Sequence, residues 1–292
     1  RAAFAAPDDD GLTVTLTSQS PFRERPYFAE ALGLDERAVR VVAPSVGGGF
    51  GVKGKPYADE IATAWCARTV GRPVKWTSTR TEGHLADYHS RDWYVDGEIA
   101  LGDDGSIRGL RVTGHSTVGA YYVHPPSLAE NFELLVSGQY EVPAVYGRMI
   151  GTFTNTTPIG IYRGAGRPEV VHFLERLIDT AAGELGMDPA ALRRRNLIPS
   201  DAFPYETVVG SVYDSGDYER TLEVALEAVG YEDWRDRQTH LREQGRYVGI
   251  GIACFVENSG SSPGMPETCR VEIHEDGSVV ASLGTHDHGQ GH

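Results

Sequence analysis

A glycine-rich run at residues 46–54 is the part of this sequence best suited to bind a ligand. It reads Val-Gly-Gly-Gly-Phe-Gly-Val-Lys-Gly, follows a β-branched segment at residues 39–42 and precedes an amphipathic helix that opens at Pro56. Glycine lets the backbone approach a ligand closely, and free amide N–H groups beside a helix start attract an anion. The run therefore predicts a site for a large phosphate-bearing ligand.

Two nucleotide-binding motifs fit this run poorly. Residues 49–54 satisfy G-x-G-x-x-G, but a dinucleotide site needs the helix to begin within the motif and an acidic residue about 20 positions later. Here Pro56 delays the helix and the next strand ends at Arg80, which leaves NADP binding as an alternative that rests on Arg80. A Walker A loop is excluded because no Ser or Thr directly follows Lys53.

A second glycine-rich loop, Gly-Ile-Tyr-Arg-Gly-Ala-Gly-Arg-Pro at residues 160–168, leads into a helix that starts at Pro168. Its two arginines suit bidentate contact with phosphate. The alternative is a tight turn with exposed arginines.

The tail at residues 285–292 contains His286 and His288, which would share one face of a strand. A zinc site is disfavoured because no Cys or carboxylate completes a convincing set of ligands. The Gly-Gln-Gly piece is more informative, since an amide between glycines suits a heterocyclic ligand.

The elements that must position these loops indicate an α+β fold with mixed sheets and packed helices, because strands and helices do not alternate regularly. The patterns predict strands at 11–19, 39–43, 73–78, 92–101, 106–119, 247–256, 269–275 and 279–284, and helices at 57–70, 168–185, 188–196 and 217–229. A polar stretch at 238–246 is suited to a linker. We therefore expect one domain over residues 1–238 and the start of a second over residues 239–292.

Charge and cysteine usage narrow the class of protein. The net charge of −14 argues against binding to nucleic acid or to a membrane surface. The basic cluster at residues 193–195 is interpreted as the solvated end of a helix. Cys66, Cys254 and Cys269 form no CxxC pair and fit buried thiols in a reducing cytoplasm. The chain starts without Met and stops inside a glycine-rich motif, so we expect a piece of a longer polypeptide.

Taken together and in this order, the loops at 47–53, 162–167 and 289–292 resemble the molybdopterin-binding large subunit of the xanthine dehydrogenase, aldehyde oxidase and carbon monoxide dehydrogenase family. Smaller matches lie between them at residues 19–21, 140–143, 196–198 and 213–216. The resemblance covers essentially the whole chain, and the ordered set is specific although each motif alone is weak.

The resemblance implies a molybdenum hydroxylase that oxidises an aldehyde or an aromatic N-heterocycle with water as the oxygen source. It implies a molybdopterin cofactor, in the cytosine dinucleotide form, whose metal no protein side chain ligates. It also implies two partners, an iron–sulfur small subunit with 2Fe–2S clusters and a medium subunit with FAD, in a cytoplasmic dimer of heterotrimers.

By the same resemblance, the cofactor-binding residues are Gln19, Gly48, Gly49, Phe50, Gly51, Arg163, Gly164, Gly289 and Gln290. Gln19 would hydrogen-bond an oxygen ligand of the metal, and Phe50 and Gly51 would offer backbone amides to its ligand sphere. Arg163 and Gly164 would line the opposite wall, and Gly289 and Gln290 would hold the pterin.

The departures from the family pattern concern the chemistry. The general-base glutamate lies in a later Gly-x-Gly-Glu segment that this chain lacks, so no catalytic residue is predicted here. Gly164 stands where carbon monoxide dehydrogenases carry a copper-binding cysteine. In the substrate pocket, Gly54 replaces the glutamate of purine hydroxylases, and Asn131 and Ala165 replace their arginine and phenylalanine. Neither copper chemistry nor purine binding is therefore expected.

Two alternatives of other classes remain at this point. One is an NADP-binding reductase domain, and the other is a catalytically silent binding or assembly module with the same fold. For the 292-residue chain alone we expect folding without molybdenum or turnover.

Overall fold

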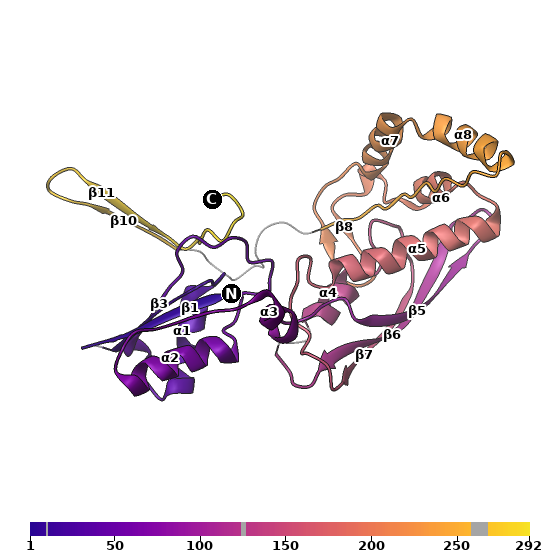
Figure 1. The fold of residues 1–292 in the computed structure, drawn as a ribbon. Helices are drawn as coiled ribbons and strands as arrows, with labels where there is room; N and C mark the ends of the chain where they lie inside the picture. Colours follow the sequence, from indigo (N-terminus) through magenta and orange to yellow (C-terminus); the bar gives the residue numbers. More distant parts are fainter. Residues whose placement is uncertain (10, 124–126, 258–267) are drawn as a thin grey trace. The chain divides into compact units, whose positions relative to one another are not determined.

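The computed structural model describes residues 1–9, 11–123, 127–257 and 268–292. The chain forms two compact units (Figure 1). Unit 1 comprises residues 1–90, 160–163 and 259–292, and unit 2 comprises residues 91–159 and 164–258. The α+β class predicted from the sequence is confirmed, since each unit combines a sheet with packed helices.

Unit 1 is built on a four-stranded sheet in the order β3-β2-β1-β4. The strands are β1 (Ala2–Asp8), β2 (Gly11–Leu16), β3 (Val39–Val42) and β4 (Val74–Thr77). β1 runs antiparallel to β2 and β4, and β2 runs parallel to β3. In β2 the side chains of Leu12, Val14 and Leu16 are buried in alternation, as the sequence pattern predicts.

Two helices, α1 (Pro21–Leu32) and α2 (Ala58–Val70), pack against this sheet. Phe28 and Ala64 are fully buried in the shared core. The predicted βαβ-like unit is present as β3–α2–β4, but β3 and β4 are separated in the sheet by β2 and β1. The shorter elements of unit 1 are η1 (Glu36–Ala38) and α3 (Arg80–Ala86).

Unit 2 contains a three-stranded sheet in the order β5-β6-β7. The predicted hairpin is confirmed as β5 (Trp93–Leu101) and β6 (Ile107–Gly119), and β7 (Val145–Phe153) pairs parallel to β6. The long helix α5 (Arg167–Leu185) lies along the sheet (Figure 1). Gly97 permits this packing, because a Cβ there would lie 2.3 Å from the Phe173 ring.

The remaining elements of unit 2 surround α5. They are α4 (Ser127–Leu135), α6 (Pro189–Asn196), η2 (Ser200–Ala202), β8 (Tyr205–Glu206), β9 (Val212–Tyr213), α7 (Tyr218–Val229) and α8 (Tyr231–Glu243). The main core contains Tyr140, Ile178 and Leu192, all fully buried.

One predicted strand, residues 247–256, is wrong: this segment has no regular secondary structure. Ile250, Ile252 and Cys254 of this segment nevertheless pack against the core of unit 2. Side chains rather than a neighbouring strand satisfy its backbone. Arg193 donates to the Ile252 carbonyl at 2.8 Å, and the Cys254 N–H donates to Glu175 at 2.9 Å.

The arginine cluster at 193–195 also differs from its interpretation as a solvated helix end. The Arg193 side chain is fully buried and pairs with Glu175 and Asp179, both at 2.8 Å. Arg194 pairs with Glu223 on the surface. Arg193 points into the core because two carboxylates there compensate its charge.

The last segment forms the predicted hairpin, β10 (Cys269–Ile273) and β11 (Val279–Leu283). The division at residue 238 stays a prediction, and that residue lies inside α8. The expectation of three buried thiols is wrong for Cys269, which is exposed, whereas Cys66 and Cys254 are half-buried. Burial raises the pKa of Cys254 to about 11.

Candidate cofactor-binding site

Gln19 holds the first glycine-rich loop from within unit 1. Its Oε1 accepts hydrogen bonds from the N–H groups of Gly51 at 2.8 Å and Lys53 at 3.2 Å. Its own N–H donates to the Lys53 carbonyl at 2.8 Å. A Cβ on Gly49 would lie 2.1 Å from Gln19 Cγ, so only glycine fits there. Residues 30 positions apart in the sequence thus form one interlocked structure.

The loop itself adopts a backbone that side chains rarely adopt. Gly48, Phe50 and Gly51 have φ values of 95°, 57° and 91°. Lys53 Nζ donates to the Gly48 carbonyl at 2.8 Å and closes the loop. Burial lowers the pKa of this ammonium group. Phe50 is a non-glycine residue in the left-handed region and is 49% exposed, a combination that often marks a functional position.

Several donors of this loop are available to a ligand. Among the residues that the structure describes, no partner accepts from Gln19 Nε2 or from the N–H groups of Gly49 and Phe50. The Gly51 N–H, in contrast, is used by Gln19. Of the two amides expected to face a metal's ligands, the structure leaves that of Phe50 open.

The tail of the chain packs against the same loop. A Cβ on Gly289 would lie 3.0 Å from the backbone of Gly48. Gln290 closes the tail into a turn, since its Oε1 accepts from the His288 N–H and its Nε2 donates to the His286 carbonyl, both at 2.7 Å. The His286 ring nitrogen Nε2 lies 3.1 Å from the Ser18 carbonyl, next to Gln19.

A cavity of about 900 Å³ lies between Gln19 and this tail. Gln19, His286, His288 and Gln290 contribute to its wall. Its volume is in the range of sites for large organic ligands. Across the described ranges, no group of three or more His, Cys, Asp or Glu side chains could hold a metal ion.

The second glycine-rich loop divides between the two units. Residues 160–163 belong to unit 1, where a Cβ on Gly51 would lie 2.7 Å from the Ile161 carbonyl oxygen. Arg163 follows in the same unit, whereas Gly164 and Ala165 belong to unit 2.

Two of the expected substrate-pocket residues are brought together in unit 2. Asn131 Nδ2 donates to the Ala165 carbonyl at 2.7 Å, and Ala165 has a φ of 47°. The third, Gly54, lies in unit 1.

This arrangement agrees with the comparison with known proteins. Residues 1–197 and 224–292 each match the molybdopterin cofactor-binding domain family. The chain belongs to this family. It is 37% identical to the carbon monoxide dehydrogenase large chain of Hydrogenophaga pseudoflava, over 96% of this chain and 37% of that protein. It is 35% identical to the 6-hydroxypseudooxynicotine dehydrogenase complex subunit gamma of Paenarthrobacter nicotinovorans, over 91% of this chain and 34% of that protein.

The fold has a solved counterpart in quinoline 2-oxidoreductase from Pseudomonas putida 86. The TM-score is 0.91 at 32% sequence identity, with 100% of this chain and 39% of that chain covered. The molybdopterin-binding fold expected from the three loops is therefore confirmed. The chain spans a little over a third of the length of these relatives.

Because the chain belongs to the molybdopterin-binding family, the NADP-binding alternative is not pursued further. The residues present fit a molybdopterin: among the described residues, Gln19 Nε2 and the N–H groups of Gly49 and Phe50 are unused donors, and Gln19 lines a cavity. The glycines at 49, 51 and 289 let the loop pack closely against Gln19, Ile161 and Gly48. In the described part of the chain, no helix is both long and apolar enough to cross a membrane.

Sequence reasoning missed three buried residues of unit 1: Tyr57, which bonds to the first glycine-rich loop, Arg1, which lies against Tyr57, and Glu24. All three side chains are at least nine-tenths buried in unit 1. A signal was present for Tyr57, which follows the loop directly and forms a capping box with Glu60 at the start of α2. The burial of Arg1 and Glu24 depends on tertiary contacts and has no local signal.

Proposed function

We propose that this chain forms molybdopterin-binding walls of a molybdenum hydroxylase that oxidises an aldehyde or an aromatic N-heterocycle. The observation that carries the proposal is the double role of Gln19. Its Oε1 fixes the glycine-rich loop, and its Nε2 is available beside the cavity. When bound, the cofactor supplies the metal centre at which oxygen from water is transferred to the substrate carbon.

The chain's own residues would position that cofactor without ligating the metal. Gln19 Nε2 and the Phe50 N–H would donate hydrogen bonds to oxygen ligands. Gly48, Gly49 and Gly51 would let the cofactor approach the backbone. Arg163 and Gly164 would form the opposite wall.

The tail would hold the pterin, with Gly289 against the first loop and Gln290 at the cavity wall. We infer the cytosine dinucleotide form of the cofactor, as expected from the family resemblance. The second match, which begins at residue 224, supports the view that residues 239–292 start a second molybdopterin-binding domain.

The electrons would leave through partner subunits. We propose an iron–sulfur small subunit and an FAD-binding medium subunit, in a cytoplasmic dimer of heterotrimers. Two relatives support a multi-subunit assembly, because they are named as a large chain and as a subunit of a dehydrogenase complex.

We further propose that the reaction uses no copper, although two relatives are carbon monoxide dehydrogenase large chains. Cu(I) requires a soft ligand such as a thiolate, and Gly164 provides none. Gly164 has a φ of 97°, and a Cβ there would lie 2.5 Å from the Pro168 ring. This backbone disfavours a cysteine at residue 164.

The substrate pocket would be lined by small or uncharged residues. Gly54, Asn131 and Ala165 carry no charge, and the Asn131 amide is used by the Ala165 carbonyl. Such a wall lacks the charged groups that would clamp a purine. We therefore propose an aldehyde or an aromatic N-heterocycle as the substrate rather than a purine.

The decisive experiment is purification of the complex that contains this chain, with and without Gln19→Ala. We expect about one molybdenum per wild-type chain, no stoichiometric copper, and dye reduction with aldehydes or N-heterocycles but not with CO. Gln19→Ala should lose about a hundredfold in kcat, because one preorganised donor contributes about that much.

The matched control is Gln238→Ala in unit 2, whose Nε2 donates to the Val248 carbonyl at 2.8 Å. It should leave turnover unchanged. The 292-residue chain alone should fold without molybdenum, since tight binding needs most of a ligand's surface buried. Molybdenum without turnover of any substrate would favour the silent-module alternative, and copper with CO oxidation would refute the copper-free proposal.

A further inference from the structure

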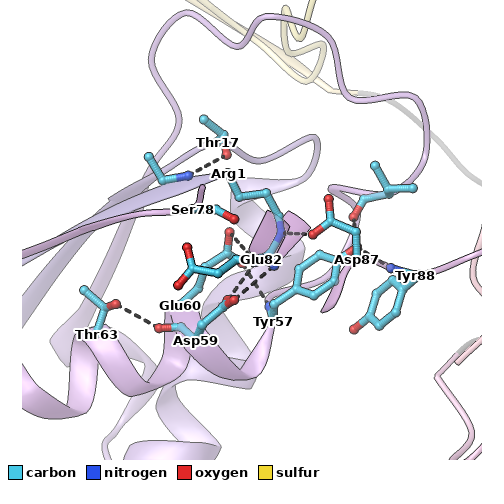
Figure 2. Close-up of polar contacts among 12 residues, drawn as sticks. Arg1, Thr17, Tyr57, Asp59, Glu60, Thr63, Ser78, Glu82, Asp87 and Tyr88 are labelled. Carbon is cyan, nitrogen blue, oxygen red and sulfur yellow. Dashed lines mark hydrogen bonds and ion pairs between the residues drawn. The ribbon is translucent and has the colours of Figure 1, made fainter. Parts of the chain in front are cut away.

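A buried polar cluster in unit 1 adjoins the first glycine-rich loop (Figure 2). Its centre is the Arg1 guanidinium, whose side chain is 2% exposed. Arg1 donates to Asp59 at 2.7 and 3.0 Å and to Asp87 at 2.8 Å. It also lies 3.6 Å from the centre of the Tyr57 ring. The two carboxylates fix the guanidinium, and the guanidinium covers the tyrosine ring.

Tyr57 fastens two backbone segments with one hydroxyl. The hydroxyl donates to the Val52 carbonyl at 2.8 Å and accepts from the Tyr88 N–H at 3.3 Å. The ring is 4% exposed and stacks on Tyr88 with ring centres 4.3 Å apart. In Figure 2 it lies between Arg1 and Tyr88. Burial raises the pKa of Tyr57 above its ordinary value, so the hydroxyl keeps its proton.

Tyr88 extends this connection to the second glycine-rich loop. A Cβ on Gly160 would lie 2.7 Å from the Tyr88 Cβ, and the Gly160 N–H donates to the His89 carbonyl at 2.9 Å. The next residue, Ile161, meets the first loop at Gly51. Tyr57 therefore contacts the first loop directly and the second loop through Tyr88.

We propose that Tyr57 is a positioning residue that sets the placement of the two glycine-rich loops relative to each other within unit 1. This inference rests on the proposed function. Val52 lies two residues from Phe50, and Ile161 lies two residues from Arg163. A shift of either segment moves the groups assigned to the metal's surroundings, and errors of about 1 Å cost up to a hundredfold in rate.

The test is Tyr57→Phe in the whole enzyme. The substitution keeps the ring, its stacking and its contact with Arg1, and removes both hydroxyl hydrogen bonds. The matched control is Tyr213→Phe, because the buried Tyr213 hydroxyl donates to the Gly138 carbonyl at 2.9 Å in unit 2. Thermal unfolding of both variants shows whether their losses of stability are comparable.

We expect Tyr57→Phe to lower kcat ten- to a hundredfold with KM within about threefold and molybdenum retained. We expect its Mo(V) electron paramagnetic resonance signal to shift. Amide hydrogen exchange over residues 49–54 and 160–163 should become several-fold faster, and Tyr213→Phe should change none of these. Equal kcat, spectra and exchange in the two variants would overturn the inference.

Hydrogen exchange separates this inference from the proposed function. If the wild-type enzyme holds no molybdenum, the proposed function fails. Faster exchange confined to the two loops in Tyr57→Phe would still support the positioning role, and unchanged exchange would refute it.

Discussion

Each unit of this chain contains one deeply buried arginine held by carboxylates, and the two clusters have different consequences. In unit 1, the 2%-exposed Arg1 pairs with Asp59 and Asp87, whose side chains are about one third exposed. In unit 2, the fully buried Arg193 pairs with Glu175, which is 6% exposed, and with Asp179, which is 34% exposed. The two clusters are therefore similar in burial and differ in the segments that they contact.

The partners of each cluster show what it holds in place. Around Glu175, its carboxylate accepts from Tyr140 at 2.7 Å, from Gln139 at 3.0 Å and from the Cys254 N–H. The Cys254 bond anchors the irregular segment 247–256 to α5, and the other two bonds join residues 139 and 140 to the same helix. The Arg1 cluster instead covers Tyr57, which contacts the glycine-rich loop. The buried arginine of unit 2 thus contacts segments of the core, and the buried arginine of unit 1 lies against the tyrosine that bonds to a glycine-rich loop.

The largest effect that tests this contrast is expected from Arg193→Met. It leaves the Glu175 carboxylate buried without its partner, which costs roughly 3–5 kcal/mol of unfolding free energy. Urea denaturation followed by far-UV circular dichroism measures the loss. Arg194→Met is the control, because its pair with Glu223 is more than one third exposed and contributes less than about 1 kcal/mol. Similar losses in both variants would contradict the larger contribution expected of the buried Arg193–Glu175 pair.

The buried arginines also show where sequence reasoning ends. The three glycine-rich loops, the α+β class, helix α2 and both predicted hairpins follow from local patterns. Burial of Arg193 does not, because it depends on Glu175 and Asp179 on another helix. A run of three arginines at a helix end predicts solvent exposure. The sequence does not show whether carboxylates of another helix lie next to it in the fold.

Helix α1 was missed for a related reason. Pro26 lies inside it and disfavours a helix, yet Phe28 and Leu32 bury their side chains against the sheet. For the candidate site, the glycines marked its position, and the role of Gln19 came from the family resemblance. The hydrogen bonds by which Gln19 fixes the loop required the structure.

A smaller effect concerns Gly164, at the junction of the two units. Gly164→Ala should cost roughly 2–3 kcal/mol, because strain at a positive φ adds to the 2.5 Å approach to Pro168. Gly186→Ala isolates the contribution of backbone strain at a positive φ. Gly186 has a φ of 64° with no atom within 4 Å of an added Cβ, and should cost about 1 kcal/mol. Thermal unfolding measures the loss of stability in each variant. Equal losses would show that the Pro168 ring moves aside at no cost in free energy.

The smallest expected effect concerns Glu24, a buried acid of unit 1. Glu175 in unit 2 pairs with an arginine, whereas Glu24 has no such cationic partner among the described residues. Glu24 is 1% exposed, its Oε2 has no hydrogen-bond partner, and no cation pairs with it among the described residues. Burial raises its pKa to about 8, with a further contribution from Glu60 and an opposing hydrogen bond with Ser18. The folded protein therefore keeps this carboxyl protonated at pH 7.

Since the folded pKa lies above the unfolded value of 4.5, the folded state binds the extra proton between pH 4.5 and 8. The stability from Glu24 is complete below that window and is lost as the pH rises through it. Relative to Glu24→Gln, which cannot ionise, the wild-type unfolding free energy should fall by about 1.4 kcal/mol between pH 6 and pH 7. Urea denaturation at the two pH values measures the difference.

Glu30→Gln, at an exposed position of the same helix, should leave the wild-type pH dependence unchanged. A parallel pH dependence of wild type and Glu24→Gln would mean that Glu24 is ionised in the folded state.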